Sequence, residues 1–275
     1  MIELEHVSFA YTDQGPSVQD VSFRLEKGEF AAILGANGAG KTTTVRLMDG
    51  LLKPTSGRVL IDGVDTTKSQ VSERAGKVGF LFQNPDRQIC KNTVREEILF
   101  GLRTVRGKEG EDALQARADE ALKEFSFTGD EEPFSLSRGQ RQRVALASIL
   151  AVEPEVLILD EPTTGLDYLE CCQIMDRIRR MNEEKQVTVV MVCHDMEVVL
   201  DYARRALVMT GGRLLADGPV PDIFRNTEVM EQASVLPPQM IDLGLRLGAG
   251  FENATSPDGM ADTVLALRRK GGRAE

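Results

Sequence analysis

A glycine-rich segment, Gly35–Thr42, has the residue types and the spacing to hold the phosphates of a nucleotide. It reads Gly-Ala-Asn-Gly-Ala-Gly-Lys-Thr and satisfies the pattern G-x-x-x-x-G-K-[ST]. Glycines keep Cβ atoms out of such a turn, so its backbone N–H groups can point at phosphate oxygens. Lys41 would add a point charge for the β- and γ-phosphates, and Thr42 a hydroxyl for Mg²⁺.

The chain on either side of this segment supplies the context that the pattern needs. Phe30–Leu34 is an apolar run that predicts a buried strand, and Thr43–Met48 predicts the start of a helix. The helix N-terminus would contribute partial positive charge to the phosphates. This context favours a triphosphate site over the alternative of a chance glycine turn.

Two adjacent carboxylates, Asp160 and Glu161, follow the aliphatic run Val156–Leu159, which predicts a strand buried on both faces. Taking carboxylates out of water is unfavourable unless a cation compensates, so a Mg²⁺ ion held through Asp160 is the natural partner. Glu161 would then be available to orient or deprotonate a water in line with the γ-phosphate. The alternative, a solvated surface pair, fits poorly with the strand that precedes it.

A second anion site is predicted where Ser137 and Gly139 open a helical pattern with an apolar stripe. One chain cannot bring two phosphate sites to one nucleotide unless it closes on itself or pairs with another chain. The residues alone leave these two arrangements open.

The composition is that of an ordinary globular protein. The 275 residues, 41% hydrophobic and 28% charged, suffice for one large domain and a smaller appendage. No apolar run approaches the ~20 residues of a membrane span and the N-terminus lacks signal-peptide features, so we expect a cytosolic chain. The net charge of −10 argues against a broad nucleic-acid surface. The four cysteines lack C-x-x-C spacing, which favours reduced thiols over metal ligands.

The apolar runs predict an α/β fold with a mostly parallel sheet. Short alternating runs within residues 1–30, around a turn at 13–16, predict a small antiparallel sheet. Further strands are predicted at Arg58–Ile61, Lys77–Phe82 and Val187–Val192.

A helical block is predicted at about residues 90–150 and could move as a subdomain. Its helices occupy 94–125, interrupted by a charged loop at 106–112, and a further helix begins at Gly139. Beyond about residue 225 the chain predicts an accessory unit.

The glycine-rich loop, the segment at Ser137 and the carboxylate pair follow one another along the chain. Their types and order resemble the motifs of the nucleotide-binding subunits of ATP-binding cassette (ABC) transporters, over about residues 1–225. The resemblance implies a P-loop NTPase core with a mostly parallel sheet, an antiparallel β subdomain and a helical signature subdomain. It further implies a small C-terminal extension at 226–275 that serves dimerisation. ATP and Mg²⁺ are the implied ligands, and ATP hydrolysis is the implied reaction.

Three catalytic roles follow from the resemblance. Glu161 resembles the catalytic glutamate, directly after Asp160, the Walker B aspartate. Gln83, in Phe-Gln-Asn-Pro, resembles the Q-loop glutamine, which touches Mg²⁺ and the attacking water and links the site to a membrane partner. His194 resembles the switch histidine that bonds the γ-phosphate; a structural histidine is the alternative, which its place after a buried strand disfavours.

The resemblance also implies the nucleotide contacts. Tyr11 would stack on adenine, although a core or surface tyrosine is the alternative. Ser137–Gln140 would cap the ATP of the opposite protomer, and Asp167 belongs to a D-loop that crosses the dimer interface. The implied nucleotide contacts are Tyr11, Asn37, Gly38, Gly40, Lys41, Thr42, Thr43, Ser137, Gly139, Gln140 and Asp167, and the implied Mg²⁺ ligands are Thr42, Gln83 and Asp160.

One residue departs from the family pattern: Arg138 stands where the signature Leu-Ser-Gly-Gly-Gln has its first glycine. Its side chain would either point at the partner's triphosphate or project into water. We expect the second, because the helix N-terminus does not depend on this residue.

Two segments look like those of the ATPase (A component) of energy-coupling factor (ECF) importers. These are Phe82–Ile89 and Leu136–Ala145, and the tail with Pro237-Pro238 also resembles the C-terminal segment of those ATPases. The resemblance implies uptake of a vitamin or a transition-metal ion, at the cytoplasmic face of the membrane. The implied partners are a second ABC ATPase, identical or paralogous, a transmembrane coupling protein and a small substrate-binding membrane protein.

Other functions fit less well. Another ABC importer is the nearest alternative. A soluble ABC factor working on ribosomes or DNA usually has two cassettes or large insertions, whereas this sequence shows one set of motifs and an acidic balance. An inert scaffold cassette is disfavoured because Lys41, Glu161 and His194 are all present.

Overall fold

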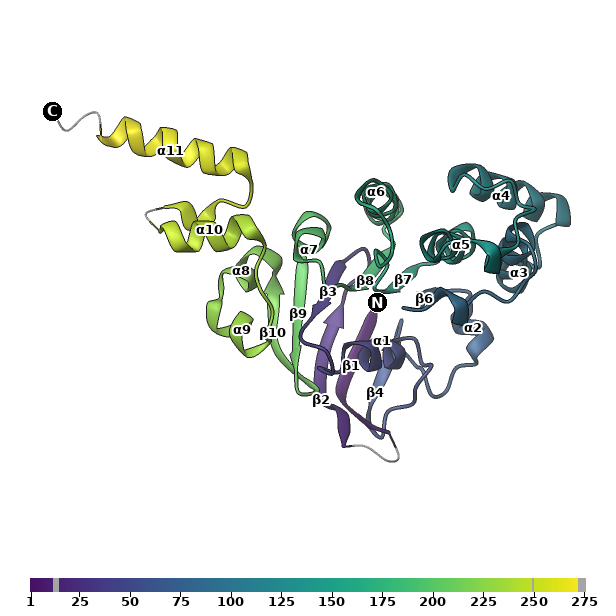
Figure 1. Cartoon of the computed structure of the whole chain (residues 1–275). Helices are drawn as coiled ribbons and strands as arrows, with labels where there is room; N and C mark the ends of the chain where they lie inside the picture. Colours follow the sequence, from purple (N-terminus) through teal and green to yellow (C-terminus); the bar gives the residue numbers. More distant parts are fainter. Residues whose placement is uncertain (12–14, 249, 272–275) are drawn as a thin grey trace.

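The computed structural model describes residues 1–11, 15–248 and 250–271, which form two β-sheets with helices around them (Figure 1). The larger sheet has six strands in the order β10-β9-β3-β8-β7-β6. Their bounds are β3 Phe30–Leu34, β6 Val78–Leu81, β7 Val156–Asp160, β8 Thr188–Val192, β9 Arg205–Thr210 and β10 Arg213–Pro219. All neighbouring pairs are parallel except β9 and β10, so the prediction of a mostly parallel sheet is confirmed.

The smaller sheet is antiparallel, as predicted for the N-terminal part of the chain. Its order is β2-β1-β4-β5. The bounds are β1 Ile2–Ala10, β2 Pro16–Leu25, β4 Ser56–Ile61 and β5 Val64–Asp65. The turn predicted at 13–16 lies partly outside the described residues.

Side chains of β3 alternate between two hydrophobic cores, one on each face of the large sheet. Phe30, Ala32 and Leu34 join a core built with helices that lie between residues 94 and 247. Ala31 and Ile33 join a core built with helix α1 (Lys41–Met48) and the antiparallel sheet. Every residue of β3 is buried, as a strand covered on both faces requires.

Three helices form the predicted helical block: α3 (Val94–Arg106), α4 (Glu111–Glu124) and α5 (Arg138–Ala151). They pack on one another and lie to one side of the large sheet (Figure 1). Helix α5 begins one residue before the predicted start, because Ser137 is its N-cap. A short helix α2 (Val71–Ala75) and single turns at Pro85–Arg87 and Pro133–Ser135 lie in the connections.

The remaining helices are α6 (Tyr168–Lys185), α7 (Met196–Tyr202), α8 (Val220–Arg225), α9 (Thr227–Gln232), α10 (Gln239–Leu247) and α11 (Pro257–Gly271), with a turn at Phe251–Asn253. Helices α10 and α11 lie beyond β10, away from the large sheet (Figure 1). Hydrogen bonds anchor this end of the chain. Gln239 N–H donates to Glu197 of α7 at 2.8 Å, and Arg225 donates from Nε to the carbonyl of Glu252 at 2.8 Å and from Nη2 to that of Asn253 at 3.3 Å. We retain residues 226–275 as a proposed accessory segment.

No helix in the described part of the chain combines the length and the apolar character that crossing a membrane requires.

Candidate active site

The carboxyl ends of four neighbouring parallel strands bring the predicted catalytic residues to one edge of the large sheet. The phosphate loop 35–42 follows β3, His194 lies beyond β8, Asp160 and Glu161 lie at the end of β7, and Gln83 lies beyond β6. These strands are adjacent in the order β3-β8-β7-β6. In open α/β sheets, ligands bind at this edge.

Glycines are required in the phosphate loop because other parts of the backbone approach it closely. Gly35 has φ +141°, and a Cβ atom there would lie 2.2 Å from the carbonyl oxygen of Met209. Gly40 has φ +100°, and its Cβ would lie 2.5 Å from the carbonyl oxygen of Ser17. The loop is therefore locked against β2 and β9, a packing reason for these two glycines beyond phosphate access.

Lys41, the first residue of α1, is buried inside the loop. Its Nζ donates to the carbonyl oxygens of Gly35 at 2.7 Å and Ala36 at 2.9 Å. Burial lowers the pKa of Lys41, and the carboxylates of Glu161 and Asp160 oppose that shift. The ammonium group thus lies between loop carbonyls and acidic side chains, where a triphosphate would exchange these contacts for stronger ones.

Asp160 fits the role of a Mg²⁺ ligand. Its side chain is 1% exposed, and Oδ1 accepts a hydrogen bond from Thr42 Oγ1 at 3.2 Å. Oδ2 is buried and has no hydrogen-bond partner among the described residues. Burial raises the pKa of Asp160. A buried carboxylate with a free oxygen beside a hydroxyl matches the oxygen ligands that Mg²⁺ uses, so Asp160 and Thr42 would hold the ion.

The carboxylate of Glu161 lies at the centre of the candidate site. Oε1 accepts from Gln83 Nε2 at 2.9 Å and lies 3.2 Å from His194 Nε2. Oε2 accepts from Thr164 Oγ1 at 3.1 Å. Three side chains from different segments therefore fix one carboxylate, an arrangement suited to orienting or deprotonating a water.

The backbone at Glu161 is held in an unusual conformation. Its φ is +57°, in the left-handed region that non-glycine residues adopt at a cost. The N–H of Glu161 donates to the carbonyl of Val192 at 2.9 Å. Gln142 Nε2, buried on α5, donates to the carbonyls of Glu161 at 3.5 Å and Pro162 at 3.4 Å.

Thr164 and Gln142 were not predicted as site residues. For Thr164, the only indication in the sequence is a hydroxyl three residues after the carboxylate of Glu161. For Gln142, it is a glutamine among apolar residues on a helix. Both depend on turns of the backbone that the sequence pattern does not specify.

The signature residues cap a helix. Ser137 Oγ accepts from the N–H of Gln140 at 3.2 Å, and Gln140 Oε1 accepts from the N–H of Ser137 at 2.9 Å. This is a reciprocal capping box at the start of α5. Among the described residues, no hydrogen bond or ion pair joins 137–140 to the phosphate loop. Among the described residues of one chain, direct bonds therefore do not bring the two predicted anion sites together.

Gly139 has a packing role. A Cβ atom at this position would lie 2.5 Å from the carbonyl oxygen of Gly165, so the start of α5 rests against the loop that follows Glu161. Arg138 is exposed, and its aliphatic part lies near Gly165.

The other predicted nucleotide contacts make no hydrogen bond to Glu161 among the described residues. Asp167 is the N-cap of α6, and its Oδ1 accepts from the N–H of Glu170 at 2.8 Å. The ring of Tyr11 is partly exposed and packs edge-on against Phe9, with centroids 4.9 Å apart. Exposed loop residues Asn37 and Gly38 and the buried Thr43 complete the predicted set.

The sequence is similar to those of known proteins. The family model described as ABC transporter matches residues 18–164. The energy-coupling factor transporter ATP-binding protein EcfA of Methanothermobacter thermautotrophicus is 40% identical over 257 residues, which are 92% of this chain and 82% of that protein. An ABC transporter ATP-binding protein of Caldanaerobacter subterraneus is 43% identical over 91% of this chain, which spans only 44% of that relative's length.

Solved structures of ABC transporter ATPases have a similar fold. CbiO1 of Clostridium perfringens, part of the ABC transporter complex CbiONQ, has a TM-score of 0.72 and 34% identity, covering 90% of this chain and 96% of CbiO1. MJ0796, a bacterial ABC transporter cassette solved as a dimer, has a TM-score of 0.74 and 32% identity over 80% of this chain and 99% of its own. The α/β architecture, the phosphate loop and these similarities lead to one conclusion: the chain belongs to the ABC transporter family and has the fold of its ATPases.

Proposed function

We propose that this chain hydrolyses ATP with Glu161 as the residue that orients and deprotonates the attacking water. The observation that carries the proposal is the fixed carboxylate of Glu161, held by Gln83, His194 and Thr164 at the end of β7. A general base needs this defined position and the ionised form. Gln83 and His194 would complete the group around the γ-phosphate.

The phosphate loop and Lys41 would bind the phosphates of ATP. Lys41 would leave the carbonyls of Gly35 and Ala36 for the β- and γ-phosphates, and the N–H groups of α1 would add partial positive charge. Mg²⁺ held by Asp160 and Thr42 would neutralise part of the phosphate charge. We include Gln83 as a third proposed ligand, although its amide contacts Glu161 here.

We further propose a head-to-tail dimer in which Ser137–Gln140 of one chain caps the nucleotide of the other. The capped N-terminus of α5 is a suitable anion site and has no bond to the phosphate loop of its own chain among the described residues. The dimeric MJ0796 cassette supports this arrangement. Exposed leucines on α10, Leu243 and Leu247, offer apolar surface for a dimerisation role of the C-terminal segment.

The transport role rests on the relatives. Similarity to EcfA and to CbiO1 supports the ATPase of an ECF-type importer, for a vitamin or a transition-metal ion. The chain would lie at the cytoplasmic face of the membrane, with a second ATPase, a transmembrane coupling protein and a small substrate-binding membrane protein. Substrate specificity would then lie on another polypeptide.

Two substitutions test the ATPase mechanism. Glu161→Gln keeps the size of the side chain and removes the base, so ATP should still bind while turnover falls and the closed dimer accumulates. Lys41→Ala removes a phosphate contact, so ATP affinity itself should fall. Equilibrium binding, phosphate release and size-exclusion chromatography with ATP measure the three properties. Normal turnover in Glu161→Gln would remove this residue from the mechanism.

Capture of the tagged chain from its own cells in mild detergent tests the transport role. Small polytopic membrane proteins together with a second ATPase would support the importer, and the substrate-binding member would narrow the cargo. Recovery of larger permease subunits would favour another ABC importer. Ribosomal or DNA-repair proteins would refute the transport role and leave the ATPase proposal standing.

A further inference from the structure

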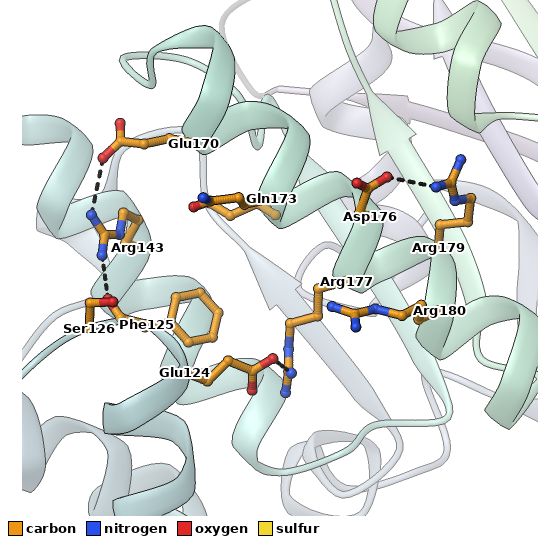
Figure 2. A pocket seen from close by; sticks show the side chains of 11 residues that line it. Glu124, Phe125, Ser126, Arg143, Glu170, Gln173, Asp176, Arg177, Arg179 and Arg180 are labelled. Carbon is orange, nitrogen blue, oxygen red and sulfur yellow. Dashed lines mark hydrogen bonds and ion pairs between the residues drawn. The ribbon is translucent and has the colours of Figure 1, made fainter.

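A cavity of about 580 Å³ lies between the helical block and α6, outside the candidate active site. Four arginines line it: Arg143 projects from α5, and Arg177, Arg179 and Arg180 project from α6 (Figure 2). Three carboxylates, of Glu124, Glu170 and Asp176, also line it, so the cavity has one positive charge in excess in a chain of net charge −10. Its volume is in the range of small-molecule sites.

Three of the arginines have acidic partners. Arg143 bonds Glu170 at 3.0 Å, Arg179 bonds Asp176 at 2.8 Å, and Arg177 forms an ion pair with Glu124. The first two pairs are drawn in Figure 2. Their carboxylates fix the positions of these guanidinium groups and offset their charges.

Donor groups without an acceptor remain on two residues. Arg180 has neither a hydrogen bond nor an ion pair to another described residue. Arg177 Nε is buried and likewise has no acceptor among the described residues. Burial lowers the pKa of Arg177, and the charge of Arg180 lowers it further. Two neighbouring cations with unused donors are stabilised by an anion between them.

The other walls of the cavity indicate which chemical group is attached to that anion. Phe125 and Ile174 contribute apolar surface to the cavity, and the guanidinium of Arg177 lies 5.8 Å from the centre of the Phe125 ring. The volume exceeds what an inorganic anion needs, so the ligand has room for an organic group on this side. A phosphate head offers several acceptor oxygens for the forked donors of the two arginines.

We propose that this cavity binds a small phosphate monoester, with Arg177 and Arg180 holding the phosphate and Phe125 contacting the organic group. The site lies where α5 and α4 meet α6. A bound ligand would therefore join the helical block to the helix that follows the loop after Glu161.

Isothermal titration calorimetry with phenyl phosphate tests this proposal on the full chain. The Lys41→Ala variant serves as background, because it weakens phosphate binding at the phosphate loop. Arg180→Gln removes an exposed, unpartnered side chain and should preserve the fold. Loss of a charge-assisted contact predicts binding weakened by about tenfold or more. Arg24→Gln, an equal change of charge on β2 outside the cavity, should leave the affinity within about twofold.

The other outcomes overturn the proposal. Equal affinity in Arg180→Gln and in its background would show that phenyl phosphate binds elsewhere. Benzoate binding as tightly as phenyl phosphate would refute the selectivity for phosphate. Binding of a glutamate-rich peptide that depends on Arg180, without binding of phenyl phosphate, would assign the cavity to an acidic segment of a partner protein.

Discussion

Replacing Thr164 with valine should slow ATP hydrolysis without weakening ATP binding. Thr164 Oγ1 is the donor to Oε2 of Glu161, at 3.1 Å, whereas Gln83 and His194 both lie at Oε1. Valine has the same shape but no hydroxyl, so Oε2 loses its partner and the carboxylate gains freedom to rotate. The substitution should change little else, since no other described side chain depends on this hydroxyl.

The magnitude follows from the exposure of the pair. Hydrogen bonds to charged groups contribute about 1.5–3 kcal/mol. The Glu161 side chain is 17% exposed, so water replaces part of the lost hydrogen bond. We therefore expect a loss near the lower end of that energy range. About 1.4 kcal/mol in the barrier is tenfold in rate, which predicts a fall of about tenfold in kcat. The KM for ATP should stay within about twofold, because no hydrogen bond between described residues joins the Thr164 hydroxyl to the phosphate loop.

Steady-state phosphate release at saturating ATP and Mg²⁺ measures both constants. Thr164→Ser keeps the hydroxyl and should restore most of the rate, which separates the hydrogen bond from packing. Full activity in Thr164→Val would show that Glu161 needs no support at Oε2. A rise in KM with unchanged kcat would place Thr164 in ATP binding instead, and either result would refute the reasoning.

Two further changes test features outside the reaction itself. Gly139→Ala should lower the free energy of unfolding by about 1–3 kcal/mol in urea denaturation, because its Cβ would meet the carbonyl oxygen of Gly165, whereas Gly110→Ala, with nothing within 4 Å, should lower it by less than about 1 kcal/mol. Burial raises the pKa of Asp49 to about 6, against the opposing effect of Arg74. The folded state then holds this proton more tightly than the unfolded state, so stability falls as pH rises from about 4 to 6. Asp49→Asn should remove that fall and raise the free energy of unfolding by about 3 kcal/mol at pH 7.5, with little gain at pH 4; an equal gain at both pH values would refute the assignment.

The sequence predicted four of the six strands of the large sheet, β3, β6, β7 and β8, from their apolar runs, whereas β9 and β10 were not predicted. Runs such as Val156–Leu159 leave few alternatives to a parallel strand, and the order of loops at its carboxyl edge follows from that topology. The position of Ser137 as a helix cap was also predictable, since its partner Gln140 is three residues away. Local spacing is enough wherever the interacting residues are neighbours in the chain.

Features that depend on the packing of distant segments could not be predicted in this way. Gly139 was interpreted through phosphate binding alone, and its close approach to Gly165 became visible only in three dimensions. The cavity that contains Arg143 and Arg180 likewise joins helices whose separation in the sequence gives no indication that they meet. The accessory segment was predicted only as a unit, without α10 or α11, because its short apolar runs do not specify helix ends.

The left-handed backbone of Glu161 sets a limit on how stable this protein can become while it still works. A non-glycine residue at φ +57° carries about 1 kcal/mol or more of strain, which Gly at the same position would relieve. Selection for thermal resistance alone would therefore favour loss of the glutamate. Persistence of Glu161 in an evolving population thus requires selection on turnover, and any stabilising consensus design should leave this position untouched.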